Sequence, residues 1–83
     1  MNTRTSYVIM SGDGAFFDGF RDGGACVWLT GLQSVDPYCK LDAAERDLVM
    51  VRSPHRWFGD EDAAVYSVCQ SDNGYYYLGG RMP

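Results

Sequence analysis

Lysine and histidine are almost absent from this chain of 83 residues, in which Lys40 is the only lysine and His55 the only histidine. Eleven acidic residues outnumber seven basic ones and give a net charge of −4. Nucleic acids and anionic membrane surfaces bind clusters of Lys and Arg. We therefore expect no direct contact with nucleic acid or a membrane. Either the acidity favours a protein partner with a basic surface, or it serves solubility alone.

Long apolar runs are absent as well. The longest run, Ala25 to Leu29, has five residues, whereas a membrane-spanning helix needs about 20. Residues 1–4 lead into no hydrophobic signal region. A chain of this length buries roughly 60% of its unfolded surface, which is enough for one modest core. We expect a single domain, residues 1–83, in the cytoplasm.

Cysteines are few and odd in number: Cys26, Cys39 and Cys69 are separated by 12 and 29 residues. A small secreted domain would have an even set of cysteines, so a reducing compartment fits better. Together with His55 they could form a three-cysteine, one-histidine zinc site, but such sites use closely spaced cysteine pairs. We expect the cysteines to pack as small hydrophobes, with no metal or cofactor.

Recognisable catalytic motifs are missing too. Gly12 and Gly14 belong to no phosphate-binding loop pattern, and three consecutive acidic residues, Asp60 to Asp62, do not converge readily on one Ca²⁺ ion. A general base would have to be His55, with Cys39 or another cysteine as its partner, but a histidine just past a helix end commonly caps carbonyls or faces water. We therefore expect no catalytic residues and no enzyme activity.

Glycines and short β-branched or aromatic segments, in contrast, are plentiful. Breakers at residues 11–14 and 18–24 separate three expected strands, and a helix and two further strands follow. The chain is predicted to be α+β, a small antiparallel sheet in the order βββαββ with one helix packed on one face. The expected strands and helix are Tyr7–Met10, Ala15–Phe17, Ala25–Leu29, the helix from Asp42 to about Arg52, Ala63–Asp72 and Tyr75–Leu78.

The helix has its own start signal and core stripe. Asp42 and Glu45 have the spacing of a capping box, and their carboxylates suit the first turn of a helix. Ala44, Leu48 and Val51 recur at helical spacing and predict the buried side.

The last two strands flank Asn73-Gly74, a pair typical of a two-residue type I′ turn. That register pairs Gln70 with Tyr77 and places three tyrosines, Tyr66, Tyr75 and Tyr77, on one face. We expect this face to be exposed, with Val65, Cys69 and Leu78 toward the helix. The reverse choice would put the tyrosines in the core and shift the binding surface to Trp57 and the acidic loop.

Trp57 and Phe58 form an apolar pair between Arg56 and the acidic triplet that starts at Asp60. Trp, Tyr and Arg supply most hot spots in protein interfaces, so this composition indicates a binding surface. The alternative is that the two rings close one end of the core as a lid.

The overall layout also resembles a class of small phage-encoded proteins. The resemblance rests on Tyr7-Val8-Ile9, a glycine-rich turn, the stretch from Ala25 to Thr30, and Leu41 to Glu45 opening a helix. In this layout, and in size and acidity, the chain is similar to small β-sheet-plus-helix proteins that include anti-CRISPR inhibitors. The resemblance implies a non-catalytic inhibitor that binds a CRISPR-Cas effector subunit and blocks nucleic-acid binding or assembly. It carries over no functional residues.

Two functions follow as expectations. The first is a non-catalytic protein-binding module, plausible as a phage inhibitor, that uses seven residues: Asp60, Glu61, Asp62, Trp57, Tyr66, Tyr75 and Tyr77. The second is a self-assembling structural or regulatory protein that dimerises through its C-terminal β-hairpin.

Overall fold

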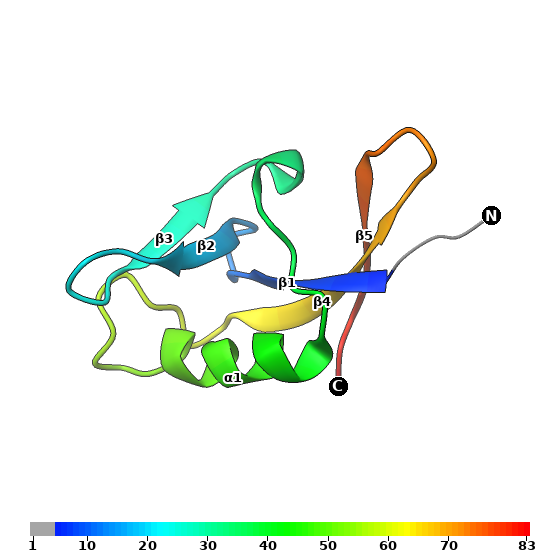
Figure 1. Cartoon of the computed structure of the whole chain (residues 1–83). Helices are drawn as coiled ribbons and strands as arrows, with labels where there is room; N and C mark the ends of the chain where they lie inside the picture. Colours follow the sequence, from blue (N-terminus) through cyan, green and yellow to red (C-terminus); the bar gives the residue numbers. More distant parts are fainter. Residues whose placement is uncertain (1–4) are drawn as a thin grey trace.

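A computed structural model describes residues 5–83. Five strands form one antiparallel sheet in the order β3-β2-β1-β4-β5, and one α-helix crosses it (Figure 1). The α+β class and the order βββαββ are confirmed. In chain order the elements are β1 (Thr5–Met10), β2 (Phe16–Phe20), β3 (Cys26–Leu29), the 3₁₀ helix η1 (Leu32–Ser34), α1 (Leu41–Val51), β4 (Ala64–Gln70) and β5 (Tyr76–Arg81).

The helix α1 covers one face of the two central strands, β1 and β4. Ala44 and Val51 are fully buried and pack against Ile9 and Val65, and Leu48 is partly buried beside them. The predicted stripe is therefore confirmed. Its apolar spacing fixes which side of the helix meets the sheet.

The predicted capping box is wrong because the helix begins one residue earlier than expected. Lys40 is the N-cap, and no side chain caps the helix there. Asp42 lies inside the first turn, where its carboxylate accepts a hydrogen bond of 2.9 Å from the N–H of Ala43. The Asp42 carboxylate still interacts favourably with the helix dipole. Because Asp42 is not the N-cap, Glu45 does not make the reciprocal hydrogen bond of a capping box.

The second face of the sheet is not bare, contrary to expectation. The segment between β3 and α1 crosses it, and η1 lies on the side opposite α1 (Figure 1). Val35 from this segment is buried with Val8, Phe16 and Val68, and Leu32 packs alongside. One short apolar connection thus gives the sheet a second small core.

Tyr38 ties this crossing segment to both neighbours. Its N–H and C=O bond the backbone of Tyr7 at 2.7 and 2.9 Å, and its hydroxyl donates to Asp47 on α1 at 2.7 Å. Burial and then the Asp47 carboxylate raise the pKa of the Tyr38 hydroxyl, so it stays protonated as a donor. The segment is therefore fixed between β1 and α1.

Strand β2 extends to Phe20, although Asp18 and Gly19 predicted that it would end at Phe17. A bulge lies between Phe17 and Phe20, where Gly19 has a φ of 99°. The extra residue reverses the side-chain alternation. As a result Phe17 and Phe20 share the α1 face, with ring centroids 4.9 Å apart.

The C-terminal hairpin has a three-residue loop, so the predicted type I′ turn is wrong. Gly74 has a φ of 88° but Asn73 does not have a positive φ. The N–H of Gly74 bonds the C=O of Ser71 at 3.0 Å, and the N–H of Ser71 bonds the C=O of Tyr75 at 2.9 Å. This is the type I turn with a glycine bulge that closes three-residue hairpins.

The extra loop residue shifts the register by one, which exchanges the two faces of β5. Gln70 pairs with Tyr76 and Val68 with Leu78, so Tyr76 and Leu78 lie on the η1 side. The expectation that Leu78 faces the helix is wrong. Tyr77 pairs with Cys69, on the same side of the sheet as Val65.

Among residues 5–83, no helix has the length and apolar character needed to cross a bilayer.

Candidate functional site

Trp57 and Phe58 lie in the aromatic loop, the name used here for residues 52–63 between α1 and β4. Their side chains are 75% and 71% exposed. The lid interpretation is therefore wrong. Two adjacent large rings on one loop form an exposed apolar patch of the kind that marks an interaction site.

Backbone hydrogen bonds hold the aromatic loop to the protein on two sides. On the helix side, the N–H of Asp60 bonds the C=O of Val51 at 2.9 Å. On the strand side, the C=O of Trp57 accepts from the N–H of Cys26 at 2.9 Å, and the C=O of Phe58 accepts from the indole N–H of Trp28. Both carbonyls at the tip are thus turned to the body of the protein while the two rings remain in solvent.

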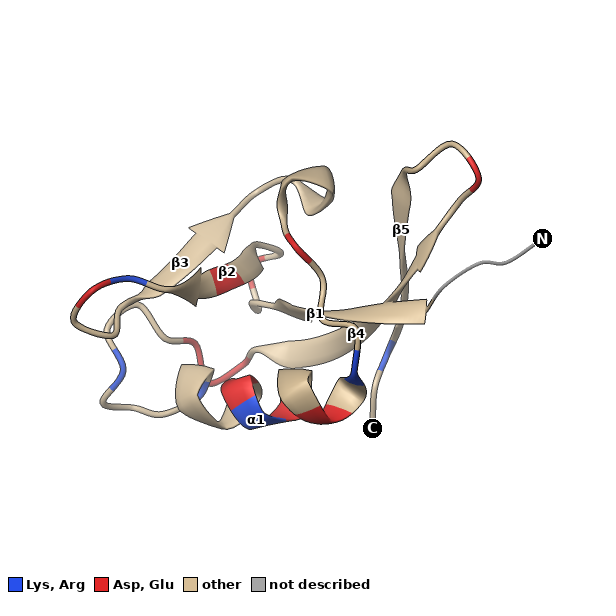
Figure 2. Cartoon of the chain, in the orientation of Figure 1, with Lys and Arg blue, Asp and Glu red and all other residues tan. Residues whose placement is uncertain are grey.

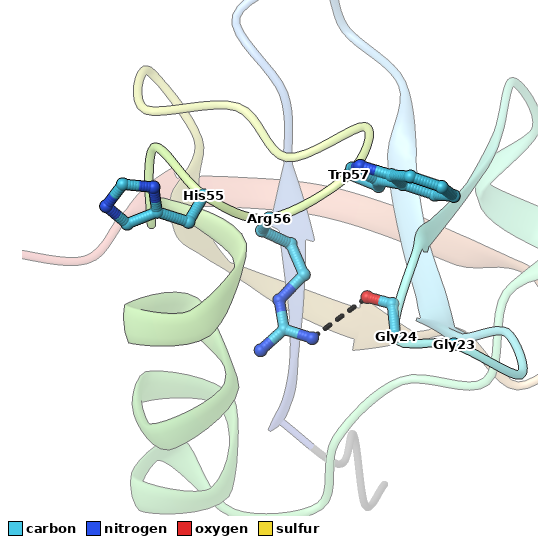
Figure 3. Close-up of a pocket in the computed structure, with 5 residues that line it drawn as sticks. All are labelled: Gly23, Gly24, His55, Arg56 and Trp57. Atoms are coloured by element: carbon cyan, nitrogen blue, oxygen red, sulfur yellow. Dashed lines mark hydrogen bonds between the residues drawn. The ribbon is translucent and has the colours of Figure 1, made fainter.

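Arg56 braces the loop from within. Its guanidinium donates to the C=O of Gly24 at 2.9 Å (Figure 3) and lies 4.9 Å from the ring centroid of Phe20. A Cβ at Gly24 would lie 2.6 Å from the Arg56 guanidinium, so glycine leaves room for this contact. The Arg56 guanidinium is therefore already bound to β2 and the β2–β3 turn. Its charge stabilises the loop in the free protein.

Phe58 has a backbone conformation that a bulky residue rarely adopts. Its φ is 57°, and it is the only non-glycine residue with positive φ among residues 5–83. Such a conformation costs about 1–2 kcal/mol and persists only where surrounding contacts impose it. The hydrogen bond from Trp28 and the fixed loop ends supply that constraint.

Replacing Phe58 with glycine should raise the free energy of unfolding by about 0.5–1 kcal/mol, because glycine adopts positive φ without steric cost. The lost ring is mostly exposed, so little packing is lost with it. Urea denaturation measures the change. Phe58→Ala is the matched control: it removes the ring, keeps the strain and should bring no gain. Equal stability of the two variants would contradict the strain.

The acidic triplet divides into one structural residue and two exposed ones. The Asp60 carboxylate accepts from the N–H of Gly12 at 3.0 Å and from the N–H of Asp62 at 2.8 Å. Asp60 therefore links the aromatic loop to the β1–β2 turn and is a positioning residue. Glu61 and Asp62 are exposed.

Asp13 is a site residue that the sequence reasoning missed. It is exposed in the β1–β2 turn, and with Phe58 and Asp60 it lines a shallow hollow. The turn comes this close because β1 lies between β2 and β4. No local sequence signal gives that strand order, although the hairpin itself was predicted.

Two shallow hollows flank the exposed rings. One of about 280 Å³ lies beside Trp57 and is lined by Gly23, Gly24, His55, Arg56 and Trp57 (Figure 3). The other, of about 300 Å³, lies beside Phe58 and is lined by Ser11, Asp13, Ala15, Trp28, Phe58, Gly59 and Asp60. The loop carries two basic residues, Arg52 and Arg56, on the arm that leaves α1 and acidic residues on the arm that enters β4 (Figure 2). The Trp57 side is therefore basic and the Phe58 side acidic.

Histidine and cysteine do not combine into a reactive centre in the described residues. His55 is exposed, and no cysteine or carboxylate is among the described residues that line its hollow. Cys26 is buried, and this burial raises the pKa of its thiol, with Arg56 opposing the shift. Cys39 and Cys69 are free and exposed, so the expectation that the cysteines pack as small hydrophobes is wrong for these two. Within residues 5–83, no three His, Cys, Asp or Glu side chains group as metal ligands, so the zinc arrangement does not form.

The predicted site residues fall into two separate places. Trp57 and the acidic triplet share the aromatic loop, which bonds β3 at one edge of the sheet. The tyrosines lie toward the other edge, with Tyr66 in β4, Tyr77 in β5 and Tyr75 directly before β5. Tyr75 and Tyr77 are 57% and 55% exposed, as expected, but Tyr66 is half-buried in the cluster on the opposite face. The single tyrosine strip that the sequence predicted does not form.

No family model matches the chain, and neither a curated protein nor a solved structure matches it.

Proposed function

We propose that this protein is a non-catalytic protein-binding module whose anchor is the pair Trp57 and Phe58. The observation that carries the proposal is the exposure of both rings on a loop held at both ends, with Phe58 in a strained conformation. Two large exposed rings do not stabilise the free monomer, whereas protein interfaces use such residues as hot spots. A loop already fixed in its binding conformation loses less entropy on association.

The charges around Phe58 indicate the partner's chemistry. Asp13, Glu61 and Asp62 are exposed beside or on the aromatic loop, and the chain as a whole carries a net charge of −4. An apolar pocket rimmed by Arg or Lys would complement this surface. Asp60 contributes less to partner binding, because its oxygens already accept two backbone hydrogen bonds.

Neutralising the exposed carboxylates should therefore weaken binding mainly at low salt. The triple variant Asp13→Asn, Glu61→Gln and Asp62→Asn is expected to lower the association rate about 10-fold at low ionic strength, with a smaller effect at high salt. Stopped-flow or surface-based kinetics over a salt series measures this.

The matched control removes three carboxylates elsewhere, as Asp36→Asn, Asp42→Asn and Glu45→Gln, and leaves the same net charge. If both triple variants lose the same association rate, total charge matters and the acidic side of Phe58 has no special role. If neither changes it, the basic-partner assignment fails while the role of the two rings stands.

A CRISPR-Cas effector subunit is the specific partner that we propose. Such complexes contain basic grooves for nucleic acid, and the acidity, size and βββαββ layout of this chain support an inhibitor that occupies one. An in vitro cleavage assay with purified effector complexes tests this directly. Inhibition that is lost in a Trp57→Ala variant supports the assignment. Absence of inhibition across effector types contradicts this partner and leaves the general binding role untouched.

A further inference from the structure

Strand β5 is an edge strand of the sheet, and the side chain of Gln33 closes part of that edge. Its Nε2 donates to the C=O of Tyr76 at 2.7 Å, and its Oε1 accepts from the N–H of Tyr76 at 2.8 Å. A primary amide offers the same donor and acceptor as a peptide group. Gln33 thus satisfies Tyr76 as a residue of an added strand would.

A bulge and Arg81 protect the C-terminal end of this edge, but the stretch from Tyr76 to Leu78 has no such device apart from Gln33. Every second residue of an antiparallel edge strand directs its N–H and C=O outward, so Leu78 shares this orientation with Tyr76. Tyr77 and Leu78 are 55% and 41% exposed, and β5 contains neither lysine nor proline. Natural edge strands usually carry such residues to prevent pairing with another chain. In this protein the Gln33 side chain blocks strand pairing at one position, Tyr76.

The sequence of β5 is complementary to itself across a two-fold axis. Two antiparallel copies centred on Tyr77 place Tyr76 of one copy opposite Leu78 of the other, so the residues that direct their N–H and C=O outward face each other. The same register places Tyr77 opposite Tyr77 of the second copy and Tyr75 opposite Gly79. Aromatic rings pair favourably across antiparallel strands, and glycine leaves space for the ring opposite it.

We propose that the edge of β5 is a self-association surface for a second copy of this chain, and that Gln33 is the latch that keeps it closed. Release of Gln33 frees the N–H and C=O of Tyr76 for the second copy. The N–H and C=O of Gly80 are both held by the hydroxyl of Ser67 on β4, at 3.1 and 3.3 Å, so the pairing with the second copy is confined to Tyr76 and Leu78. This surface lies at the edge opposite the one that carries the aromatic loop and goes beyond the proposed binding function.

The test is the substitution Gln33→Ala in the full chain. Gln33 is exposed, so alanine removes the latch with little loss of packing. Sedimentation velocity over a concentration series should show a dimer dissociation constant at least 10-fold lower than that of the wild type, which corresponds to about 1.4 kcal/mol. Hydrogen exchange of the Tyr76 amide reports the opened edge in the monomer.

A second substitution locates the interface. Proline at position 78 removes the outward N–H, and edge strands tolerate proline when its N–H would face solvent. The double variant Gln33→Ala with Leu78→Pro should therefore return to the wild-type association state. Gln33→Ala with Trp57→Ala should still dimerise, which separates this surface from the aromatic loop.

Several results would overturn the proposal. A folded Gln33→Ala chain that stays as monomeric as the wild type contradicts it, and so does a dimer that survives Leu78→Pro. Failure of Gln33→Ala to fold also contradicts it, because a latch on an exposed edge is not required for folding. Capture of an extended peptide by the opened edge, without a dimer, would assign a different occupant.

Discussion

Replacing Trp57 with alanine is expected to weaken partner binding about 30-fold or more, since a buried interface tryptophan is commonly worth at least about 2 kcal/mol. The free energy of unfolding should stay within about 0.5 kcal/mol of the wild type, as is usual for exposed positions. Trp57 is 75% exposed in the free protein, and its backbone C=O, which bonds Cys26, is kept by alanine. Isothermal titration and urea denaturation measure the two quantities.

Val49→Ala provides the matched control. Val49 is 72% exposed and lies on α1, outside the aromatic loop. Its loss removes exposed apolar surface without touching Trp57 or Phe58, so binding should be unchanged. If Val49→Ala and Trp57→Ala weaken binding equally, general surface hydrophobicity explains the interaction and the loop has no privileged part in it.

The second large effect is expected from Gly59→Ala, which should lower the free energy of unfolding by about 2 kcal/mol through steric overlap. A Cβ at this position would lie 2.5 Å from the backbone oxygen of Val51 and 3.1 Å from the Cβ of Arg56. The same Val51 oxygen accepts the N–H of Asp60, so the aromatic loop must move away from the helix end. Partner binding should weaken about 10-fold, because the displaced loop loses its preorganised conformation.

Gly31→Ala is the control for this substitution. The nearest atom to a Cβ at Gly31 is the hydroxyl of Ser34 at 3.6 Å, an ordinary contact, and its φ is −105°. Alanine there should leave stability unchanged or slightly higher, because it restricts the unfolded chain. Wild-type stability and binding in Gly59→Ala would contradict the close approach of the loop to the helix.

Local patterns sufficed for most elements of the fold. Helical spacing of Ala44, Leu48 and Val51 identified the buried side of α1, and the breakers between apolar segments located the strands. The register of the last hairpin could not be predicted in the same way. Asn73-Gly74 fits both a two-residue turn and a three-residue loop, since glycine adopts positive φ in each. In the structure the longer loop places Tyr76 on the η1 side, where Gln33 bonds its backbone.

The candidate site was predicted in composition but not in its assembly. Trp57 and Phe58 stood out because two large rings lay beside charges. Asp13 joins the site only because β1 lies between β2 and β4, and the bond from Arg56 to Gly24 forms only because the loop reaches β3. Asp60 was counted among the partner-binding residues, whereas its hydrogen bond to Gly12 joins two loops that are 48 residues apart in sequence. Such long-range contacts leave no periodic signal in the chain.

The measurement that tests the proposed binding function most directly is comparative affinity capture with the wild type, Trp57→Ala and Val49→Ala, each folded and immobilised at equal density. Recovered proteins are quantified by mass spectrometry from a bacterial lysate that contains CRISPR-Cas effector complexes. If the aromatic loop is the binding surface, one recovered protein should be enriched by the wild type and by Val49→Ala and should be lost with Trp57→Ala. Equal recovery by all three would contradict the loop as the binding surface.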